Sequence, residues 1–341
     1  MLALLDPSPW TPRSRRSNDK ERSETMPIEQ SRSKEWALIL GGSSGFGLAT
    51  AHKLSMEGYS VCVVHRDRRG AMKRIEPEFE KIEARGVGFL SFNTDALDAE
   101  QRDNVLDGLA ERLGTEGAVR VLLHSIAFGN LKLVAPEESA DRRSGALLAE
   151  QLSVDSAVLT EVADQLFAEG VDGLRGIASA PEYSSEMFLE EEDMARTIHS
   201  MGTSLLGWTQ SLHARGMFGA DARVFGLTSE GNTVAWKGYA AVAAAKVALE
   251  SVSRSIAVEM AHFGIRSNVI QAGVTDTPAL RMIPGSAHLK AHARTRNPFG
   301  RLTTPEDIAD VIYLLSLPEA AWVNGEVIRV DGGEAVSGLS R

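Results

Sequence analysis

The chain has 341 residues, 43% of them hydrophobic and 24% charged, which is enough for one large globular domain. The formal net charge of −10 argues against a nucleic-acid surface, and the single cysteine, Cys62, excludes an internal disulfide and fits a reducing compartment. The sequence lacks an apolar stretch long enough to span a membrane and a recognisable signal peptide, so we expect a cytoplasmic protein.

The N-terminal segment differs in composition from the rest of the chain. Residues 1–34 are rich in Ser, Arg, Pro and Glu without periodicity, which predicts a disordered tail. From residue 35 onward, short apolar runs alternate with helix-like segments, as in a parallel sheet covered on both faces. The expected strands are 36–40, 59–64, 87–92, 119–124, 223–228, 266–270 and 326–330. We therefore predict one α/β domain over 35–341, a Rossmann-like, doubly wound parallel sheet.

One connection in this pattern is unusually long. About 100 residues separate the fourth and fifth expected strands, whereas about 30 separate the others. Residues 199–215 suit the expected crossover helix, which leaves 131–185 as an insertion. Leu147, Leu152, Val158 and Leu166 belong to apolar series with helical spacing in this insertion. A helical pair over a substrate cleft, a solvent-side decoration and an oligomer contact are all compatible with it.

A glycine-rich turn follows the first expected strand and opens the first helix. Glycine allows a tight turn and close approach of the backbone to a pyrophosphate, which the helix N-terminus also attracts. This context makes the turn a strong prediction of nucleotide binding. The residues expected to bind the cofactor here are Gly41, Ser43, Ser44, Gly45, Phe46 and Gly47.

The end of the second expected strand bears on the choice of nucleotide. An acidic residue there is typical of NAD binding, but His65 stands in that place and Arg66 follows it. A guanidinium matches a 2′-phosphate, so NADPH is favoured, although Asp67 keeps NADH open. Asp95, just past the third expected strand, suits the adenine amine or a helix cap. We expect no metal site.

Tyr239 and Lys246 are seven residues apart on what we expect to be one alanine-rich helix. Seven residues are about two turns, so both side chains are expected on the same helix face. A nearby ammonium favours phenolate, which predicts that Lys246 lowers the pKa of Tyr239. A proton donor matched to working pH would result. A buried tyrosine beside an unrelated lysine is the ordinary alternative, and the glycine turn argues against it.

Together these residues resemble the short-chain dehydrogenase/reductase superfamily over nearly all of 35–341. Further matching segments are 268–277, 300–309 and 330–333. Within the superfamily, three departures look like the enoyl-acyl-carrier-protein reductases. His124-Ser125-Ile126-Ala127-Phe128 follows the fourth strand, Val242 occupies the usual tyrosine position of Tyr-x3-Lys, and Ala272-Gly273 replaces Pro-Gly. Ser229 resembles the NADPH-dependent enoyl reductase branch, and also the serine of carbonyl reductases.

The resemblance implies roles for individual residues. Lys246 would hold the nicotinamide ribose, and Ser229 would donate to the substrate carbonyl or orient Tyr239, unless it only caps a strand end. Thr277 and the backbone after Gly273 would hold the carboxamide and pyrophosphate. The remaining cofactor contacts that the resemblance implies are Ala96, Ser125, Ile126, Ala127 and Val274. A homotetramer or homodimer is the family expectation.

Two other residues have ordinary structural explanations. His124 suits a hydrogen-bonded core histidine better than a catalytic base, and Tyr183, where the insertion ends, suits packing. Met201 stands where carbonyl reductases usually carry a proton-relay asparagine, which weakens the interpretation of the protein as a carbonyl reductase.

The expected reaction is NADPH-dependent reduction of the 2,3-double bond of an enoyl thioester, carried by acyl carrier protein or coenzyme A. Hydride would go to C3 while charge develops on the distant thioester oxygen. A tyrosine moved three residues along a helix is displaced by about 4.5 Å, the right order for this change. A carbonyl reductase or alcohol dehydrogenase of the same fold is the alternative. An NADP-binding sensor without turnover is a third possibility, which the Tyr239/Lys246 pair disfavours.

Overall fold

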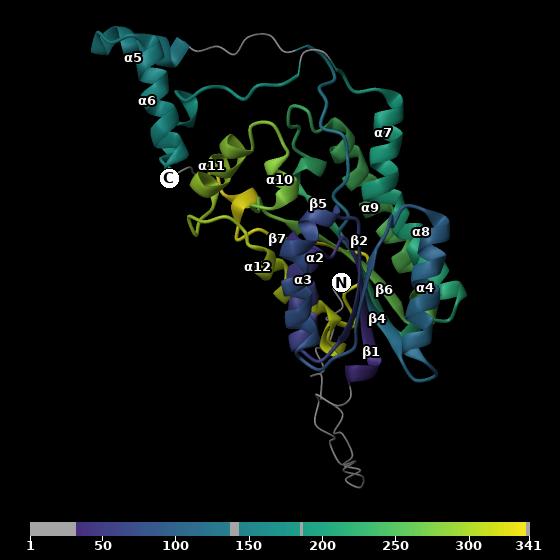
Figure 1. Ribbon diagram of the computed structural model, residues 1–341. Helices are drawn as coiled ribbons and strands as arrows, with labels where there is room; N and C mark the ends of the chain where they lie inside the picture. The colour runs from purple at the N-terminus through teal and green to yellow at the C-terminus, as the bar shows by residue number, and fades with distance from the viewer. Residues whose placement is uncertain (1–31, 137–142, 185–186, 339–341) are drawn as a thin grey trace, which may run out of the picture.

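Seven strands form one parallel sheet in the order β3-β2-β1-β4-β5-β6-β7. The computed structural model describes residues 32–136, 143–184 and 187–338 (Figure 1). The strands are β1 (Glu35–Leu40), β2 (Ser60–His65), β3 (Phe89–Asn93), β4 (Ala118–His124), β5 (Phe218–Ser229), β6 (Ile265–Ala272) and β7 (Val327–Val330). The predicted doubly wound Rossmann-like fold is confirmed, and β5 extends farther toward the N-terminus than its predicted range.

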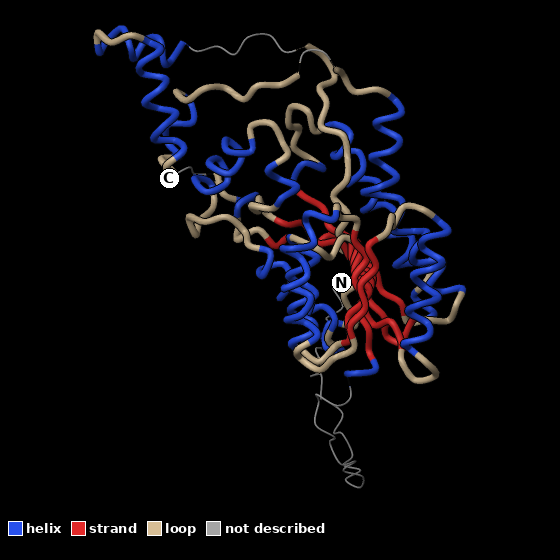
Figure 2. Tube along the Cα trace, in the orientation of Figure 1, coloured by secondary structure: helices blue, strands red, loops and turns tan. Residues whose placement is uncertain are grey.

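Helices cover both faces of this sheet (Figure 2). One face packs against α4 (Ala99–Leu113), α8 (Ser204–Ala214) and α9 (Ala240–Glu259). The other face packs against α2 (Gly45–Met56), α3 (Arg69–Glu83) and α12 (Pro305–Ser316). The crossover into β5 is longer than predicted, since α7 (Glu191–Ile198) continues through a π-helical turn, η3 (His199–Thr203), into α8.

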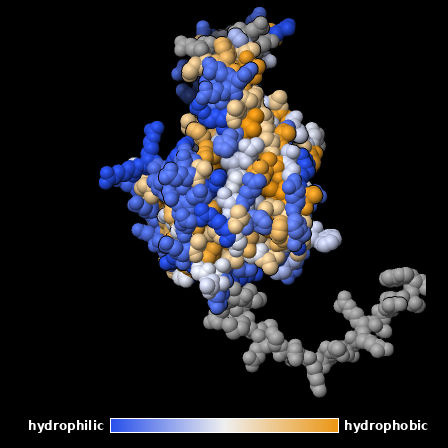
Figure 3. Space-filling model, turned by 90° about the vertical axis from the view of Figure 1, so that its right-hand side faces the viewer, coloured by the Kyte–Doolittle hydropathy of each residue, from blue (hydrophilic) through white to orange (hydrophobic). Residues whose placement is uncertain are grey.

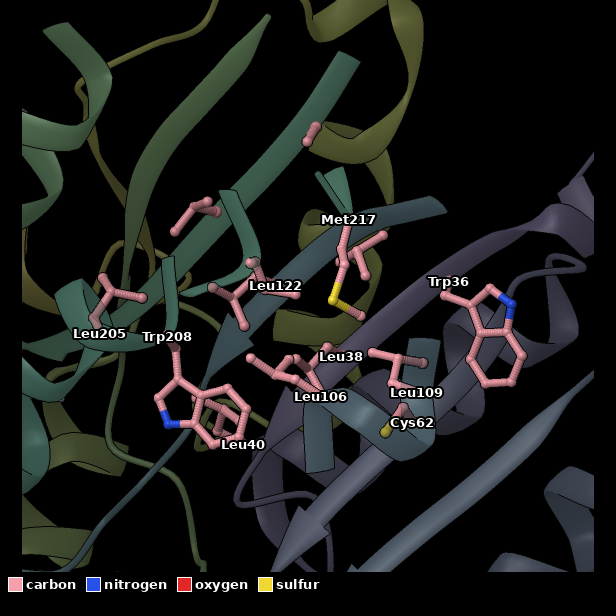
Figure 4. Packing of buried hydrophobic residues seen from close by; sticks show 14 of the residues in the cluster. Trp36, Leu38, Leu40, Cys62, Leu106, Leu109, Leu122, Leu205, Trp208 and Met217 are labelled. Carbon is pink, nitrogen blue, oxygen red and sulfur yellow. The ribbon is translucent and has the colours of Figure 1, made fainter. Parts of the chain in front are cut away.

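The larger part of the apolar core lies between the sheet and the α4, α8 and α9 layer. Leu38 of β1 and Leu122 of β4 are fully buried there against Leu106 and Trp208 (Figure 4). The indole N–H of Trp208 donates to the carbonyl oxygen of Ala96 at 2.8 Å, so this buried polar atom is satisfied. The same bond fixes the segment after β3, where a cofactor contact is expected.

The long connection between β4 and α7 contains the predicted helical pair. It consists of α5 (Arg143–Leu152), α6 (Ser156–Ala168) and the 3-10 helix η2 (Asp172–Gly176). A bridge between Leu133 and Phe188 pairs the two ends of this segment, and η2 contacts α11 (Ser286–Arg296). The apolar side chains of α5 and α6 stay exposed, for example Leu147 at 50% and Val158 at 54%. Whether the pair covers the substrate cleft stays a prediction.

The predicted tail lies almost entirely outside the described residues. Residues 32–34 form a 3-10 helix, η1 (Arg32–Lys34), in which Arg32 donates to the hydroxyl of Tyr313 at 3.2 Å. Regular structure thus begins three residues before the predicted boundary at 35, because Arg32 finds a partner on α12. Within the described parts of the chain, no helix has both the length and the apolar character that crossing a membrane requires.

A group of charged side chains ties the amino ends of β4, β5 and β6 together. The carboxylate of Asp221 accepts from Arg120 at 2.7 Å and from Arg266 at 2.6 Å, and also from Arg223. The Arg223 side chain is fully buried. Burial raises the pKa of Asp221, but the arginines outweigh it, and the net direction is a lowered pKa. The carboxylate is therefore held charged beside cations that cannot lose a proton.

Replacing Asp221 by Asn tests this arrangement. The amide keeps the size of the side chain but leaves Arg120 and Arg223 buried without their counter-charge. We expect the free energy of unfolding to fall by about 3–5 kcal/mol, measured by urea denaturation. Because the folded pKa of Asp221 is lowered, its stabilisation in the wild type is lost as the pH falls through that pKa. An unchanged urea midpoint in the variant would contradict this account.

Candidate functional site

The carboxyl ends of four neighbouring strands gather the predicted site residues at one edge of the sheet. Leu40 pairs with His124 across β1 and β4, and Ser229 pairs with Ala272 across β5 and β6. The glycine turn, the Ser125 segment, Ser229 and the loop after Ala272 therefore begin at the same edge. Ligands of open α/β sheets bind at this edge.

The glycine turn packs too closely for larger residues. Gly41 has φ +84°, and a Cβ there would lie 2.5 Å from the carbonyl oxygen of Ser125. A Cβ on Gly47 would overlap the carbonyl oxygen of Gly41. The side chain of Ser44, the N-cap of α2, makes no capping hydrogen bond, so the first-turn N–H groups of α2 lack that partner. The turn and this donor set fit the pyrophosphate of a dinucleotide.

The loop after β6 closes over the glycine turn. Thr277 caps the short helix α10 (Pro278–Arg281) by accepting from the N–H of Leu280 at 3.2 Å. Its Cγ2 lies 3.4 Å from the position of a Cβ on Gly45. The N–H of Val274 donates to the Glu334 carboxylate at 3.2 Å. Thr277 thus lies beside the turn, and Val274 is held by the C-terminal segment; their cofactor contacts stay a prediction.

Arg66 and Asp95 form an ion pair that the sequence did not indicate. Nη1 of Arg66 lies 2.6 Å from Oδ2 of Asp95, and the guanidinium lies 4.5 Å from the centre of the Phe128 ring. Asp95 also accepts from the N–H of Leu97 at 2.9 Å, whereas Asp98 is the N-cap of α4. The helix-cap alternative for Asp95 is therefore wrong.

Asp67, the acidic residue that left NADH as the alternative cofactor, is also paired with another side chain. Its Oδ2 lies 2.9 Å from Nδ1 of His65, and the His65 side chain is almost fully buried. His65, the last residue of β2, and Asp67 thus contact one another.

Tyr239 lies at the start of α9 and not on it. It is the N-cap residue, with φ −110° and ψ 3°, and follows Gly238, whose φ is +70°. The prediction that Tyr239 lies on the same helix as Lys246 is therefore wrong by one residue. The helix begins at Ala240, because Gly238 with its positive φ turns the chain just before it. The phenol oxygen lies 3.5 Å from Oγ of Ser229.

The predicted effect of Lys246 on Tyr239 is also wrong for this structure. Burial raises the pKa of Tyr239, and the hydrogen bond with Ser229 offsets this only in part. Nζ of Lys246 instead donates to the carbonyl oxygen of Leu227 at 2.9 Å. Burial lowers the pKa of Lys246 to about 8, while the nearby Glu250 raises it. Both groups are shifted toward their neutral forms by the same desolvation.

Glu250 is a neighbour of the site that sequence reasoning missed. Its Oε1 accepts from Thr228 at 2.7 Å and from the amide of Asn232 at 2.6 Å. It thus ties α9 to the strand end and to the loop after Ser229. Its spacing of four residues from Lys246 on one helix was the available signal.

The remaining predictions concern residues behind the site. His124 is a buried, hydrogen-bonded core residue, as predicted: its Nε2 lies 2.8 Å from Oγ of Ser204, and burial lowers its pKa to about 3. Val242 and Met201 belong to one small buried apolar cluster with Ala245. Val242 stands where the Tyr-x3-Lys pattern has its tyrosine, and Met201 stands where carbonyl reductases usually carry an asparagine. Packed apolar side chains therefore fill both positions. Among the described residues, no His, Cys, Asp and Glu are grouped in a way that would hold a metal ion.

Comparisons with known proteins identify the family of this chain. Residues 157–334 match the family "Enoyl-(Acyl carrier protein) reductase", and residues 35–143 match "short chain dehydrogenase". A tropinone reductase homolog from Arabidopsis thaliana is 24% identical over 305 residues, 89% of this chain and 94% of that protein. A 3-oxoacyl-(acyl-carrier-protein) reductase from Vibrio cholerae is 28% identical over 177 residues, 52% of this chain and 71% of that protein.

Solved structures show the same fold. The NADH enoyl-(acyl-carrier-protein) reductase of Aquifex aeolicus superposes with a TM-score of 0.64 at 22% identity, covering 89% of this chain and 98% of that one. A short-chain dehydrogenase from Burkholderia cenocepacia in complex with NADP gives 0.63 at 22% identity, with 89% and 98% coverage. The chain belongs to the short-chain dehydrogenase/reductase family and is an NAD(P)H-dependent oxidoreductase.

Replacing Gly47 by Ala tests the glycine turn. The added methyl overlaps the Gly41 carbonyl, so we expect about 1–3 kcal/mol of destabilisation and weaker nucleotide binding, measured by urea denaturation and NADPH fluorescence. Gly70→Ala on α3 is the matched control, since a Cβ there meets nothing within 4 Å. Equal nucleotide affinity in both variants would show that the turn does not bind the dinucleotide.

The pKa of Lys246 predicts an alkaline limit to nucleotide binding. With a pKa of about 8, Lys246 is charged at pH values well below 8 and loses its proton as the pH rises through about 8. We expect the dissociation constant of NADPH to increase above that pH, because a neutral amine is a weaker donor to the ribose hydroxyls. Fluorescence titration from about pH 6 to about pH 10 measures it. The same alkaline limb in Lys246→Arg would assign the titration to another group.

Proposed function

We propose that the protein reduces the 2,3-double bond of an enoyl thioester, on acyl carrier protein or coenzyme A, with NADPH. The observation that carries this proposal is the buried Val242, packed with Met201 and Ala245. This packing removes the hydroxyl from the position next to the hydride path. The phenol of Tyr239, beside Ser229, is the donor that is left for a more distant oxygen.

The side-chain chemistry of the site suits stabilisation of an enolate. NADPH, when bound, would supply a hydride to C3 of the substrate, and the resulting enolate would take up a proton at C2 from solvent to give the saturated thioester. Tyr239, whose pKa is raised, stays protonated at neutral pH and donates to the thioester oxygen as negative charge develops there. Ser229 orients the phenol, and Lys246 holds the nicotinamide ribose. This role does not require a lowered pKa of the phenol, because the developing oxyanion needs a donor that is still protonated.

NADPH is preferred to NADH in this proposal. Arg66 lies beside Asp95 and the Phe128 ring, where the adenosine end of the cofactor is expected. Asp67, the acid that would accept from an NAD ribose, is engaged by His65. A 2′-phosphate brings two negative charges to which the guanidinium can turn, whereas a 2′-hydroxyl offers the guanidinium much less.

An apolar cavity beside Tyr239 suits an acyl chain. It has a volume of about 490 Å³, and its lining includes Leu133, Val134, Pro136, Trp236 and Tyr239. Cavities of this size and character hold apolar ligands, with a few polar groups for orientation. A fatty acyl or polyketide chain would lie there with its thioester toward Tyr239.

Carbonyl reduction remains the second candidate. It is favoured by the contact between Ser229 and Tyr239, a hydroxyl pair that can polarise a ketone, and by the names of relatives such as the 3-oxoacyl reductase. The two candidates differ in product, since one saturates the chain and the other forms an alcohol.

We also expect a homotetramer or homodimer. Figure 3 shows apolar side chains exposed between hydrophilic ones on the side of the molecule that carries α4, α7 and α8. On the neighbouring α9, Val247 is 47% and Val258 78% exposed. Burial of such residues between subunits would stabilise an assembly.

NADPH oxidation with 2-enoyl and 3-oxoacyl thioesters tests the proposal, with products identified by mass. We expect enoyl turnover, and we expect Tyr239→Phe to lower kcat by about 10²–10⁴-fold because the proton donor is lost. Tyr313→Phe, beside Arg32 on the far side of the fold, is the matched control. Turnover of 3-oxo substrates alone would reject enoyl reduction in favour of the carbonyl candidate.

A further inference from the structure

Three charged side chains from distant parts of the sequence meet behind the site. Nη2 of Arg296, the last residue of α11, lies 2.7 and 2.6 Å from the two carboxylate oxygens of Glu230. The same nitrogen lies 3.1 Å from Oε1 of Glu334. The Arg296, Glu230 and Glu334 side chains are 19%, 14% and 2% exposed, so water screens this group only weakly.

Each carboxylate is attached to a different part of the site. Glu230 follows Ser229 directly in the chain, so its position constrains the serine. Glu334 accepts from the N–H of Val274 through Oε2 at 3.2 Å, and Val274 lies on the loop expected to hold the nicotinamide carboxamide. The β5–β6 ladder ends at Ser229 and Ala272, so the residues beyond it need other contacts to keep their separation.

The position of Arg296 on α11 adds a second constraint. Two residues earlier, Arg294 faces the insertion and lies 2.5 Å from Oδ1 of Asp172. The amide of Asn297, the next residue, donates to the carbonyl oxygen of Asp331 at 2.9 Å. The contact of Asn297 limits how far Arg296 can move, whereas Arg294 points away from Glu230 and Glu334 toward the insertion.

We propose that Arg296 is a positioning residue: by bridging Glu230 and Glu334 it holds Ser229 at a fixed place relative to the carboxamide loop at Val274. The inference rests on the proposed function only in the role it gives to that loop. Arg296 acts through Ser229 and Val274 and does not touch the reacting atoms. Its loss would therefore matter only where those two groups are used.

A double-mutant cycle between Arg296→Gln and Ser229→Ala tests this inference. We expect Arg296→Gln to lower kcat at least about ten-fold in the wild-type background and less than about two-fold in the Ser229→Ala background. A purely structural role would lower kcat by the same factor in both. Arg296→Lys keeps the charge but lacks the planar guanidinium and is one bond shorter, so we expect partial rescue.

Two further measurements complete the test. The dissociation constant of NADPH, measured by fluorescence without substrate, should rise by about two- to ten-fold in Arg296→Gln, because the Val274 loop loses its anchor. Arg294→Gln is the matched control on the same helix. It breaks the contact with Asp172, and we expect no coupling to Ser229. If Arg296→Gln does not fold, Glu230→Gln removes the same ion pair with a smaller change.

The result can be separated from the proposed function. The cycle is run with whichever thioester, enoyl or 3-oxo, the wild type turns over. Equal losses in both backgrounds together with an unchanged NADPH affinity would overturn the role of Arg296 while leaving enoyl reduction intact. Coupling measured only with a 3-oxo substrate would support Arg296 and reject the enoyl proposal.

Discussion

The parallel pairing of β1, β4, β5 and β6 is the constraint on which the whole site depends. Because these strands run in the same direction and in fixed register, the segments that follow them start at one edge of the sheet. The close contact between Gly41 and Ser125 shows how little space separates these segments. Lys246 and Glu250 of α9 then reach the end of β5, where they contact Leu227 and Thr228.

Desolvation, more than charge pairing, sets the chemistry of the two central residues. It raises the pKa of Tyr239 and lowers that of Lys246, so each moves toward its neutral form. Glu250 partly restores the charge of the lysine, while the lysine donates to the Leu227 carbonyl. A neutral phenol beside a serine is suited to donating a hydrogen bond, which is the task in stabilising an enolate or polarising a ketone.

Local sequence patterns predicted most of the fold but few of the ion pairs and hydrogen bonds around the site. The strands and the glycine turn are encoded by short apolar runs and by glycine spacing, so they were found close to their true bounds. The start of α9 was misplaced because an alanine-rich run continues a helix pattern backward, and only Gly238 marks the boundary. The Arg66–Asp95 pair and the Glu230–Arg296–Glu334 group join residues far apart in sequence. No periodicity reports such contacts, since they form only when the chain has folded.

The position of Tyr239 off the helix changes which observation favours enoyl reduction. A displacement calculated from helical rise no longer applies to a residue at the N-cap. Val242 gives the stronger argument, because it is 4% exposed and packs in a cluster with Met201. A tyrosine in its place would need room that this packing denies it. The distinction between the two reactions thus rests on an apolar residue that excludes a hydroxyl, and Tyr239 is the donor that remains.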